Sequence, residues 1–354
     1  MALIVADGAG ESGGGRPLRS GRLVDMTTQT TGTAYRWGSL GTDDVGAWAE
    51  LVNHLAVVDG TEEFSSAEDL AEELRAPGTD PERDTVAVWA GDTLVGYGAT
   101  GVPQTLDHEG QARAYLDGGV HADHRGRGLG TELVRHLEQR AQELLAQRHP
   151  DVPGYLSAGG GLDGSGSREL LGDHGYAVVR YFNLLGRDLA DPPAVAEIDG
   201  VELRTPTDED EEAVRLAHNA AFRDHWGSGE SDAERWHERW VSRSARPAVS
   251  TVAVARGGEL DGQVLAYVMA AQWVDREAYV AILGTVAAAR GRGIAAAALA
   301  RTIGLAAASG DYDVIELDVD SDSPTGATRL YERLGFALKH RSAAMRKPLT
   351  APTT

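Results

Sequence analysis

Hydrophobic and polar positions follow a similar order of patterns twice along the chain. Apolar residues at 133, 134, 137, 141, 144 and 145 recur at three- and four-residue steps, which predicts a helix with one buried face. The alanine-rich stretch 295–308 predicts a second such helix. Residues 312–320 (YDVIELDVD) are β-branched and alternating, which predicts a buried strand, whereas the corresponding segment 154–160 (GYLSAGG) is a weaker match.

Short segments also repeat at nearly constant spacing. The segment TVAV occurs at residues 85–88 and again at 251–254, followed each time by a turn with glycine and another strand-like run, so we expect two hairpins. Polar segments at Thr42 and Thr207 suit helix N-termini. Residues 175–189 align without gaps to residues 335–349. These repeats indicate a tandem duplication.

The chain has the length of two ordinary domains, and a segment rich in proline and small residues suggests where they meet. Paired prolines and small residues at 188–200 interrupt both periodicities and predict a linker at 191–200. We therefore expect domains at 26–190 and 201–349. The first 25 residues lack apolar periodicity and are expected to be a disordered tail, with Met1 and Met26 both open as the true start.

Composition excludes several classes of function. The absence of cysteine excludes disulfides and thiolate metal sites, and His121 and His124 are too isolated to predict a metal site of another kind. The formal net charge of -21 argues against a nucleic-acid surface. No apolar run approaches the length of a membrane span. We expect a cytoplasmic protein without metal, nucleic-acid or membrane partners, as a monomer or homodimer.

The most informative repeat is a glycine-rich loop, RGRGLG at residues 125–130 and RGRGIA at 290–295. A glycine turn before a helix presents backbone N–H groups at the positive end of the helix dipole, which suits a diphosphate. A single copy would indicate only a surface turn. Residues 291–296 also fit a dinucleotide fingerprint, but Thr131 breaks that pattern in the first copy, and both loops come late in their repeats.

Residues 284–336 closely resemble the GNAT superfamily of acyl-CoA N-acyltransferases, through the loop, the helix behind it, the next strand and the terminal LYERLGF. Residues 118–142 carry the same loop. The resemblance implies two tandem domains of the α/β (α+β) class, each a mixed, mostly antiparallel sheet flanked by helices, and acetyl-CoA as acyl donor. It implies donor-binding residues in both copies: Val286, Arg290, Gly291, Arg292, Gly293, Ile294, Ala295 and Ser323, and Val120, Arg125, Gly126, Arg127, Gly128, Leu129 and Gly130. Ser323 stands where many relatives have asparagine.

The resemblance also implies a catalytic tyrosine. Tyr331 lies in the LYE segment, where relatives commonly protonate the departing CoA thiolate, although a tyrosine there could simply pack in the core. The aligned residue of the first half is Leu171, which cannot donate a proton. The second domain is therefore expected to be catalytic. Glu277 is the first candidate for the base that accepts the amine proton, and an exposed strand-edge glutamate is the simpler alternative.

The acceptor is the least determined part of the prediction. Residues 218–236 follow the first helix of the second domain, where this family builds its acceptor pocket, and Phe222, Asp224, His225 and Trp226 are its candidates. We expect a primary amine of a small molecule. Tandem domains with an active second half are also similar to mycothiol synthases, which acetylate a cysteinyl amino-sugar. Protein amines, and a non-catalytic acyl-CoA-binding module, remain open alternatives.

Overall fold

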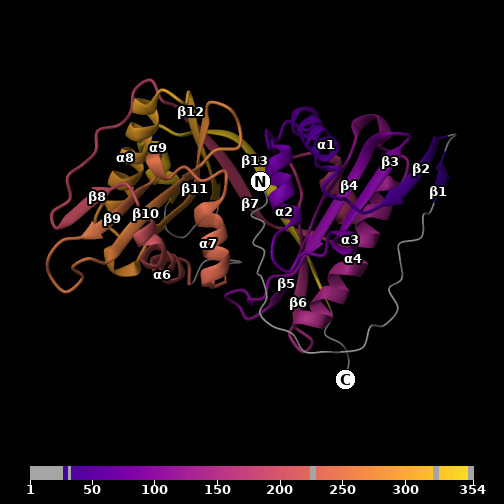
Figure 1. The fold of residues 1–354 in the computed structure, drawn as a ribbon, viewed down its shortest axis with the longest axis horizontal. Helices are drawn as coiled ribbons and strands as arrows, with labels where there is room; N and C mark the ends of the chain where they lie inside the picture. The colour runs from indigo at the N-terminus through magenta and orange to yellow at the C-terminus, as the bar shows by residue number, and fades with distance from the viewer. Residues whose placement is uncertain (1–26, 31–32, 224–228, 322–326, 350–354) are drawn as a thin grey trace. The chain divides into compact units, whose positions relative to one another are not determined.

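The computed structural model describes residues 27–30, 33–223, 229–321 and 327–349. The chain forms two compact units (Figure 1). The first unit contains the described residues up to Leu106, Gly110–Val179 and the chain from Ala343 onward. The second unit contains Asp107–Glu109 and Arg180–Ser342.

The sheet of the first unit has the order β1-β2-β3-β4-β5-β6-β13, with antiparallel neighbours except for the parallel pair β5–β6. Its strands are β1 (Thr27–Thr30), β2 (Thr33–Gly38), β3 (Thr85–Ala90), β4 (Thr93–Gly101), β5 (Ala112–Val120) and β6 (Gly154–Gly159), with part of β13. Its helices are α1 (Val45–Val58), α2 (Ala67–Leu74), α3 (Pro81–Asp84), η1 (Ala122–His124), α4 (Leu129–Arg148) and α5 (Gly166–Asp173).

The second unit repeats this arrangement in the order β7-β12-β11-β10-β9-β8, and here β11–β12 is the parallel pair. Its strands are β8 (Val201–Arg204), β9 (Thr251–Ala255), β10 (Val264–Ala271), β11 (Glu277–Thr285) and β12 (Val314–Asp320), with part of β7. Its helices are η2 (Asp208–Asp210), α6 (Glu211–Phe222), α7 (Ala233–Val241), η3 (Pro247–Val249), η4 (Ala287–Ala289), α8 (Ile294–Ser309) and α9 (Ala327–Arg333).

The last strand of each repeat belongs to the sheet of the other unit. Strand β7 (Ala177–Asp188) ends the first repeat, and its residues 182–188 pair with β12 of the second unit. Strand β13 (Ala337–Pro348) ends the second repeat, and its residues 344–348 pair with β6 of the first unit. The expected limits 26–190 and 201–349 follow the repeats along the sequence, and they remain predictions of domain boundaries.

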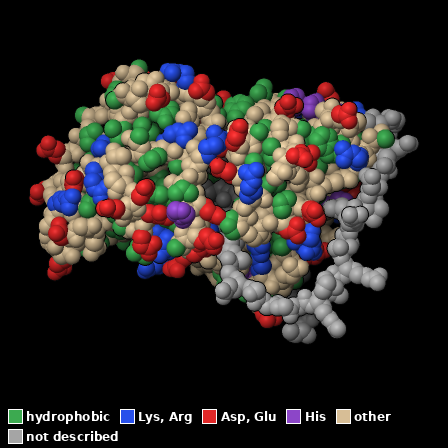
Figure 2. Space-filling view, viewed as in Figure 1, with side chains coloured by type: hydrophobic (Ala, Val, Ile, Leu, Met, Phe, Trp, Pro, Cys, Tyr) green, Lys and Arg blue, Asp and Glu red, His purple; other side chains and the backbone are tan. Residues whose placement is uncertain are grey.

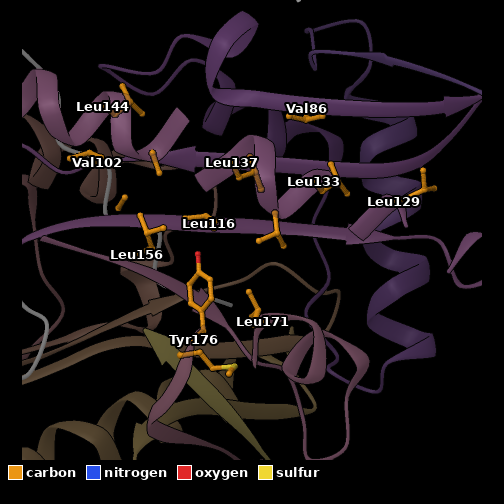
Figure 3. Close-up of a cluster of buried hydrophobic side chains, with 14 of the residues drawn as sticks. Val86, Val102, Leu116, Leu129, Leu133, Leu137, Leu144, Leu156, Leu171 and Tyr176 are labelled. Carbon is orange, nitrogen blue, oxygen red and sulfur yellow. The ribbon is translucent and has the colours of Figure 1, made fainter. Parts of the chain in front are cut away.

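Each sheet is covered by helices on both faces. In the first unit, Val86 and Val88 pack in the cluster that contains α4, whereas Ala87, which points the other way, packs with α1 and α2. Figure 3 shows the first of these clusters, with Leu129, Leu133 and other side chains of α4 against the strands. The second unit divides in the same way between α8 on one face and α6 with α7 on the other.

The expected fold class, mixed and mostly antiparallel sheets flanked by helices, is confirmed. The expected hairpins are β3–β4 and β9–β10, and the expected helices are α4 and α8. Strands β1, β2 and β8 were not predicted. In the parts of the chain that the structure describes, every helix is too short or too polar to cross a bilayer.

Candidate active site

Both glycine loops adopt the conformation that an anion site requires. Gly126, Gly128, Gly291 and Gly293 have φ between 70° and 81°, and a left-handed N-cap, Gly128 or Gly293, begins α4 or α8. The N-cap of each helix is a glycine, which has no side chain to bond to the first N–H groups of α4 or α8, and such groups suit an anionic ligand. A Cβ added at Gly291 would meet no atom within 4 Å, so the cradle is open.

The arginines of the two loops are engaged differently. Arg125 makes a bidentate ion pair with Asp59, at 2.7 and 2.8 Å, and Arg127 donates to the Tyr35 hydroxyl at 3.0 Å. Arg290 donates to the carbonyls of residues 285 and 221, and it makes no ion pair within the described ranges. Because Asp59 neutralises Arg125, the second loop has more positive charge free for phosphate oxygens. Figure 2 shows one face of the molecule, on which acidic side chains are widely distributed.

The remaining donor-site candidates lie beside these loops. Val120 ends β5, and Val286 follows β11 and donates its N–H to the carbonyl of Leu265 at 3.0 Å. Leu129 and Ile294 are the first helical residues, both almost fully buried, and Gly130 and Ala295 follow them. The structure therefore brings together every donor-site candidate of each copy except Ser323, which lies outside the described residues.

Tyr331 and Leu171 occupy equivalent places. Each lies in a short helix whose chain then turns through a glycine at φ 85°, Gly335 or Gly175, and each accepts a backbone N–H five residues on, at 3.1 and 3.0 Å respectively. Both side chains are buried, Leu171 beside Tyr176 in the first core (Figure 3). Burial raises the pKa of Tyr331 to about 12, so its phenol keeps its proton at neutral pH.

The parallel strands of each unit stay paired over only part of their length. Strands β11 and β12 pair from Glu277–Val314 to Tyr279–Glu316, and β5 and β6 pair from Ala112–Gly154 to Leu116–Ala158. Beyond these positions each sheet divides, on the side where β5 or β11 leads to its glycine loop. The division is the splayed sheet that a cleft for an extended ligand needs.

Strand β11 contains a bulge that β5 lacks. Met269 of β10 pairs with Ile282, but the next residue, Ala270, pairs with Val280, so Ala281 is extra. The pairing of β4 with β5 is regular throughout. A bulge leaves one residue out of the ladder, and bulges are common next to active sites.

Following the ladders across each unit identifies the counterparts of the β11 and β12 side chains. Glu277 pairs with Val314, and the equivalent position of β5 is Arg113, paired with Tyr155. Tyr279 has Tyr115 as its counterpart. Asp318 pairs with Leu184 of β7, and its counterpart is Gly159, which pairs with Ala344 of β13. The two carboxylates therefore occur only in the second unit.

The first long helix of each unit, α1 or α6, is joined to a serine further along the chain by the same pair of hydrogen bonds. The Asn219 side chain exchanges two hydrogen bonds with the backbone of Ser231, at 2.9 and 3.0 Å, and Asn53 does the same with Ser65. In the second unit this clamp closes the segment that follows Phe222. Asp224, His225 and Trp226 lie in that segment and outside the described residues.

Phe222 packs against His218, with ring centroids 4.7 Å apart, and His218 Nδ1 is hydrogen bonded to the buried Tyr267 hydroxyl at 2.6 Å. Burial raises the pKa of Tyr267 well above its ordinary value, so this phenol stays neutral. Neither His218 nor Tyr267 was predicted as a site residue. The repeated tyrosine Tyr97 was the available signal, because it occupies the same position in the first hairpin.

In the first unit the same face is acidic. Tyr97 is hydrogen bonded to Asp117, whose pKa is raised, first by burial and then by Glu63. Burial, with Asp117 next in importance, raises the pKa of Glu73 to about 8. The position of Glu73 in α2 corresponds to Arg239 in α7, counted from the helix N-caps Ser66 and Asp232. The two units therefore present different environments on the faces covered by these helices.

The family model described as "Acetyltransferase (GNAT) family" matches residues 48–149 and 212–336, one match in each repeat. The chain belongs to the GNAT acetyltransferase family. It is a tandem GNAT acyltransferase, as the loops, the terminal LYERLGF and the duplication predicted. No curated protein matches the chain in sequence.

Solved GNAT structures cover nearly the whole chain. A GCN5-related N-acetyltransferase from Sphaerobacter thermophilus has 28% sequence identity and a TM-score of 0.70, over 89% of this chain and 95% of that protein. A tandem GNAT protein from the clavulanic acid biosynthesis pathway has 21% identity and a TM-score of 0.62, over 90% of this chain and 99% of that protein. Both similarities extend over almost the whole of each chain, and the second supports the fold alone.

Proposed function

We propose that the second unit transfers an acetyl group from acetyl-CoA to a primary amine of a small molecule. The observation that carries this proposal is the buried phenol of Tyr331 in the second repeat, where the first repeat has Leu171. The bulge at Ala281 and the carboxylates Glu277 and Asp318, also found only in the second repeat, support the same assignment. The first unit is then a scaffold that has kept the loop without the proton donor.

The loop at 290–295 fits the diphosphate of coenzyme A. Gly291 and Gly293 leave room for phosphate oxygens at their α-carbons, and the uncapped N–H groups of α8 point toward an anion placed there. Arg290 and Arg292, whose contacts within the described chain are to backbone carbonyls, add positive charge. The bound donor supplies a thioester, whose carbonyl carbon is the electrophile for the amine. The residues that would hold it are therefore Val286, 290–295 and Ser323.

Each proton of the reaction has a candidate group. An amine nitrogen forms a bond to the thioester carbonyl carbon as the carbon–sulfur bond breaks, so the sulfur gains a proton and the nitrogen loses one. Tyr331 donates to the sulfur, because its raised pKa of about 12 keeps the phenol protonated until the thiolate forms. Glu277, at the first paired position of β11, accepts the proton of the amine, directly or through water. Phe222, Asp224, His225 and Trp226 stay the candidates for the acceptor pocket, and the last three of them lie outside the described residues.

Thiol release with a panel of small amines, amino-sugars and peptide amines tests the proposal. We expect Tyr331→Phe to lower kcat by about 10²- to 10⁴-fold, the usual contribution of a general acid, with an unchanged Kd for CoA. Tyr312→Phe is the matched control, since Tyr312 is equally buried in the same core, and it should keep full activity.

Two results would contradict the proposal. A wild-type protein that binds CoA and acetylates none of these amines would be a non-catalytic acyl-CoA-binding module. Thermal protection by NAD(H) with none by CoA would instead show that the loop holds a dinucleotide. Acetylation of a cysteinyl amino-sugar in preference to the other amines would select the mycothiol synthase-like alternative.

A further inference from the structure

In the second unit, two hydrogen-bonded side chains lie where β11 and β12 cease to pair. Tyr279 is the last β11 residue paired with β12, and its hydroxyl donates to Asp318 Oδ2 at 2.7 Å. Asp318 lies two residues beyond Glu316, the partner of Tyr279, and so on the same face of the sheet. The carboxylate therefore lies where β11 and β12 begin to separate, which is where the proposed acyl group and acceptor meet.

Asp318 differs from the other carboxylates on its strand. Glu316 and Asp320 are buried, and they form ion pairs with Lys339 and Arg180 respectively. Asp318 is exposed, and within the described chain its one side-chain partner is the neutral Tyr279 hydroxyl. A hydrogen bond from a phenol fixes the carboxylate and leaves its negative charge uncompensated.

The tyrosine that holds the Asp318 carboxylate is itself part of an aromatic pair. Trp273 packs edge-on against the ring of Tyr279, with centroids 5.4 Å apart and an interplanar angle of 76°. Aromatic faces next to a carboxylate suit an ammonium group, which gains from both the ion pair and the ring electrons. Arg276 does not neutralise the Asp318 carboxylate, because its guanidinium forms a bidentate ion pair with Asp313, at 2.6 Å for both hydrogen bonds.

We propose that Asp318, positioned by Tyr279, whose ring packs against Trp273, binds a second, non-reacting ammonium group of the acceptor, so that the preferred substrates are diamines or polyamines. This inference rests on the proposed function of the same site. Glu277 is already the proposed acceptor of the proton from the attacking nitrogen, so Asp318 is assigned to a different ammonium group of the same molecule. The first unit has Gly159 at this position and cannot make the contact.

The test compares 1,4-diaminobutane with 1-aminobutane, which differ by one ammonium group. Binding to the CoA-loaded protein is measured by calorimetry at low salt, and turnover by thiol release. We expect wild type to bind the diamine more tightly, and Asp318→Asn to lose roughly fivefold or more of that affinity with little change for the monoamine. Tyr279→Phe should lose part of it. Asp313→Asn, which removes an exposed carboxylate already paired with Arg276, should lose none.

The outcomes separate the inference from the function on which it rests. Equal affinities of wild type and Asp318→Asn for the diamine, or no binding of the diamine by wild type, would overturn the inference even if other amines are acetylated. Turnover of neither amine, with a diamine affinity that still depends on Asp318, would support the subsite and count against the proposed reaction. An unchanged Kd for CoA shows that each variant is folded.

Discussion

The two repeats have the same frame and differ where chemistry would occur. The asparagine clamps, the left-handed glycines and the turn after the short helix recur with matching contacts. Across these matched positions, Tyr331 is replaced by Leu171, Glu277 by Arg113 and Asp318 by Gly159. The comparison teaches that the glycine loop recurs with the shared fold, whereas the side chains proposed for chemistry occur in the second repeat alone at these matched positions.

The same contrast extends to charge at the loops. In the first unit Asp59 occupies the guanidinium of Arg125, and the acidic group of Asp117 and Glu73 lies on the face toward α1 and α2. In the second unit the loop arginines contact carbonyls, and Arg239 replaces Glu73. We therefore expect an anionic donor to bind the second loop more readily than the first.

The largest expected effect tests which unit each terminal strand stabilises. Leu185 of the first repeat is buried in the core of the second unit, and its counterpart Met345 is buried in the core of the first. We expect Leu185→Ala and Met345→Ala each to cost about 2–5 kcal/mol of stability. Hydrogen exchange should show faster opening of the second unit for Leu185→Ala and of the first for Met345→Ala, and the reverse assignment would refute the strand exchange.

A smaller effect should separate the two loops. Gly128→Ala and Gly293→Ala both place a side chain at a left-handed φ, 81° and 79°, so each should cost about 1–2 kcal/mol of stability. Only Gly293→Ala should also raise the KM for acetyl-CoA, by about tenfold or more, because its methyl group occupies the cradle of the donor diphosphate. Equal KM values for the two variants would show that the loops do not differ in function.

A further expected effect is a pH dependence of stability that comes from Glu73 of the first unit. Glu73 has a folded pKa of about 8, raised from 4.5, so between these pH values the folded protein holds a proton that the unfolded chain has released. Its contribution to stability should therefore fall as the pH rises from about 4.5 to 8. Urea unfolding at several pH values should show a flatter dependence for Glu73→Gln, whereas Arg239→Gln should leave the slope in this range unchanged.

The sequence predicted those parts of the fold that depend on local pattern. The period of α4, the buried strand β12 and the glycine conformations follow from neighbouring residues alone. The exchange of β7 and β13 was not predicted, because the two strands align with each other and either could complete either sheet. Strand β8 is short and half-buried along its length, so its pattern gave no signal.

The site divides in the same way. Tyr331 and the loops were predicted from recurring motifs, but Asp318 and Tyr279 become a pair only through the register of β11 with β12. The bulge at Ala281 adds one residue to β11 relative to β5. An alignment of the two repeats without gaps from their glycine loops therefore places Glu277 opposite Ala112 instead of Arg113. His218 is the first residue of the candidate segment 218–236, but its contact with Tyr267 depends on the folded structure and could not be predicted from the sequence.

The crossing of the terminal strands also sets an order for synthesis. Strand β6 obtains one of its two neighbours from residues 344–348, which are made long after β6 itself. During translation the first unit therefore cannot complete its sheet until residues 344–348 have been made, and the edge of β6 stays unpaired until then. An edge open to pairing with other chains is therefore exposed throughout the synthesis of the second repeat.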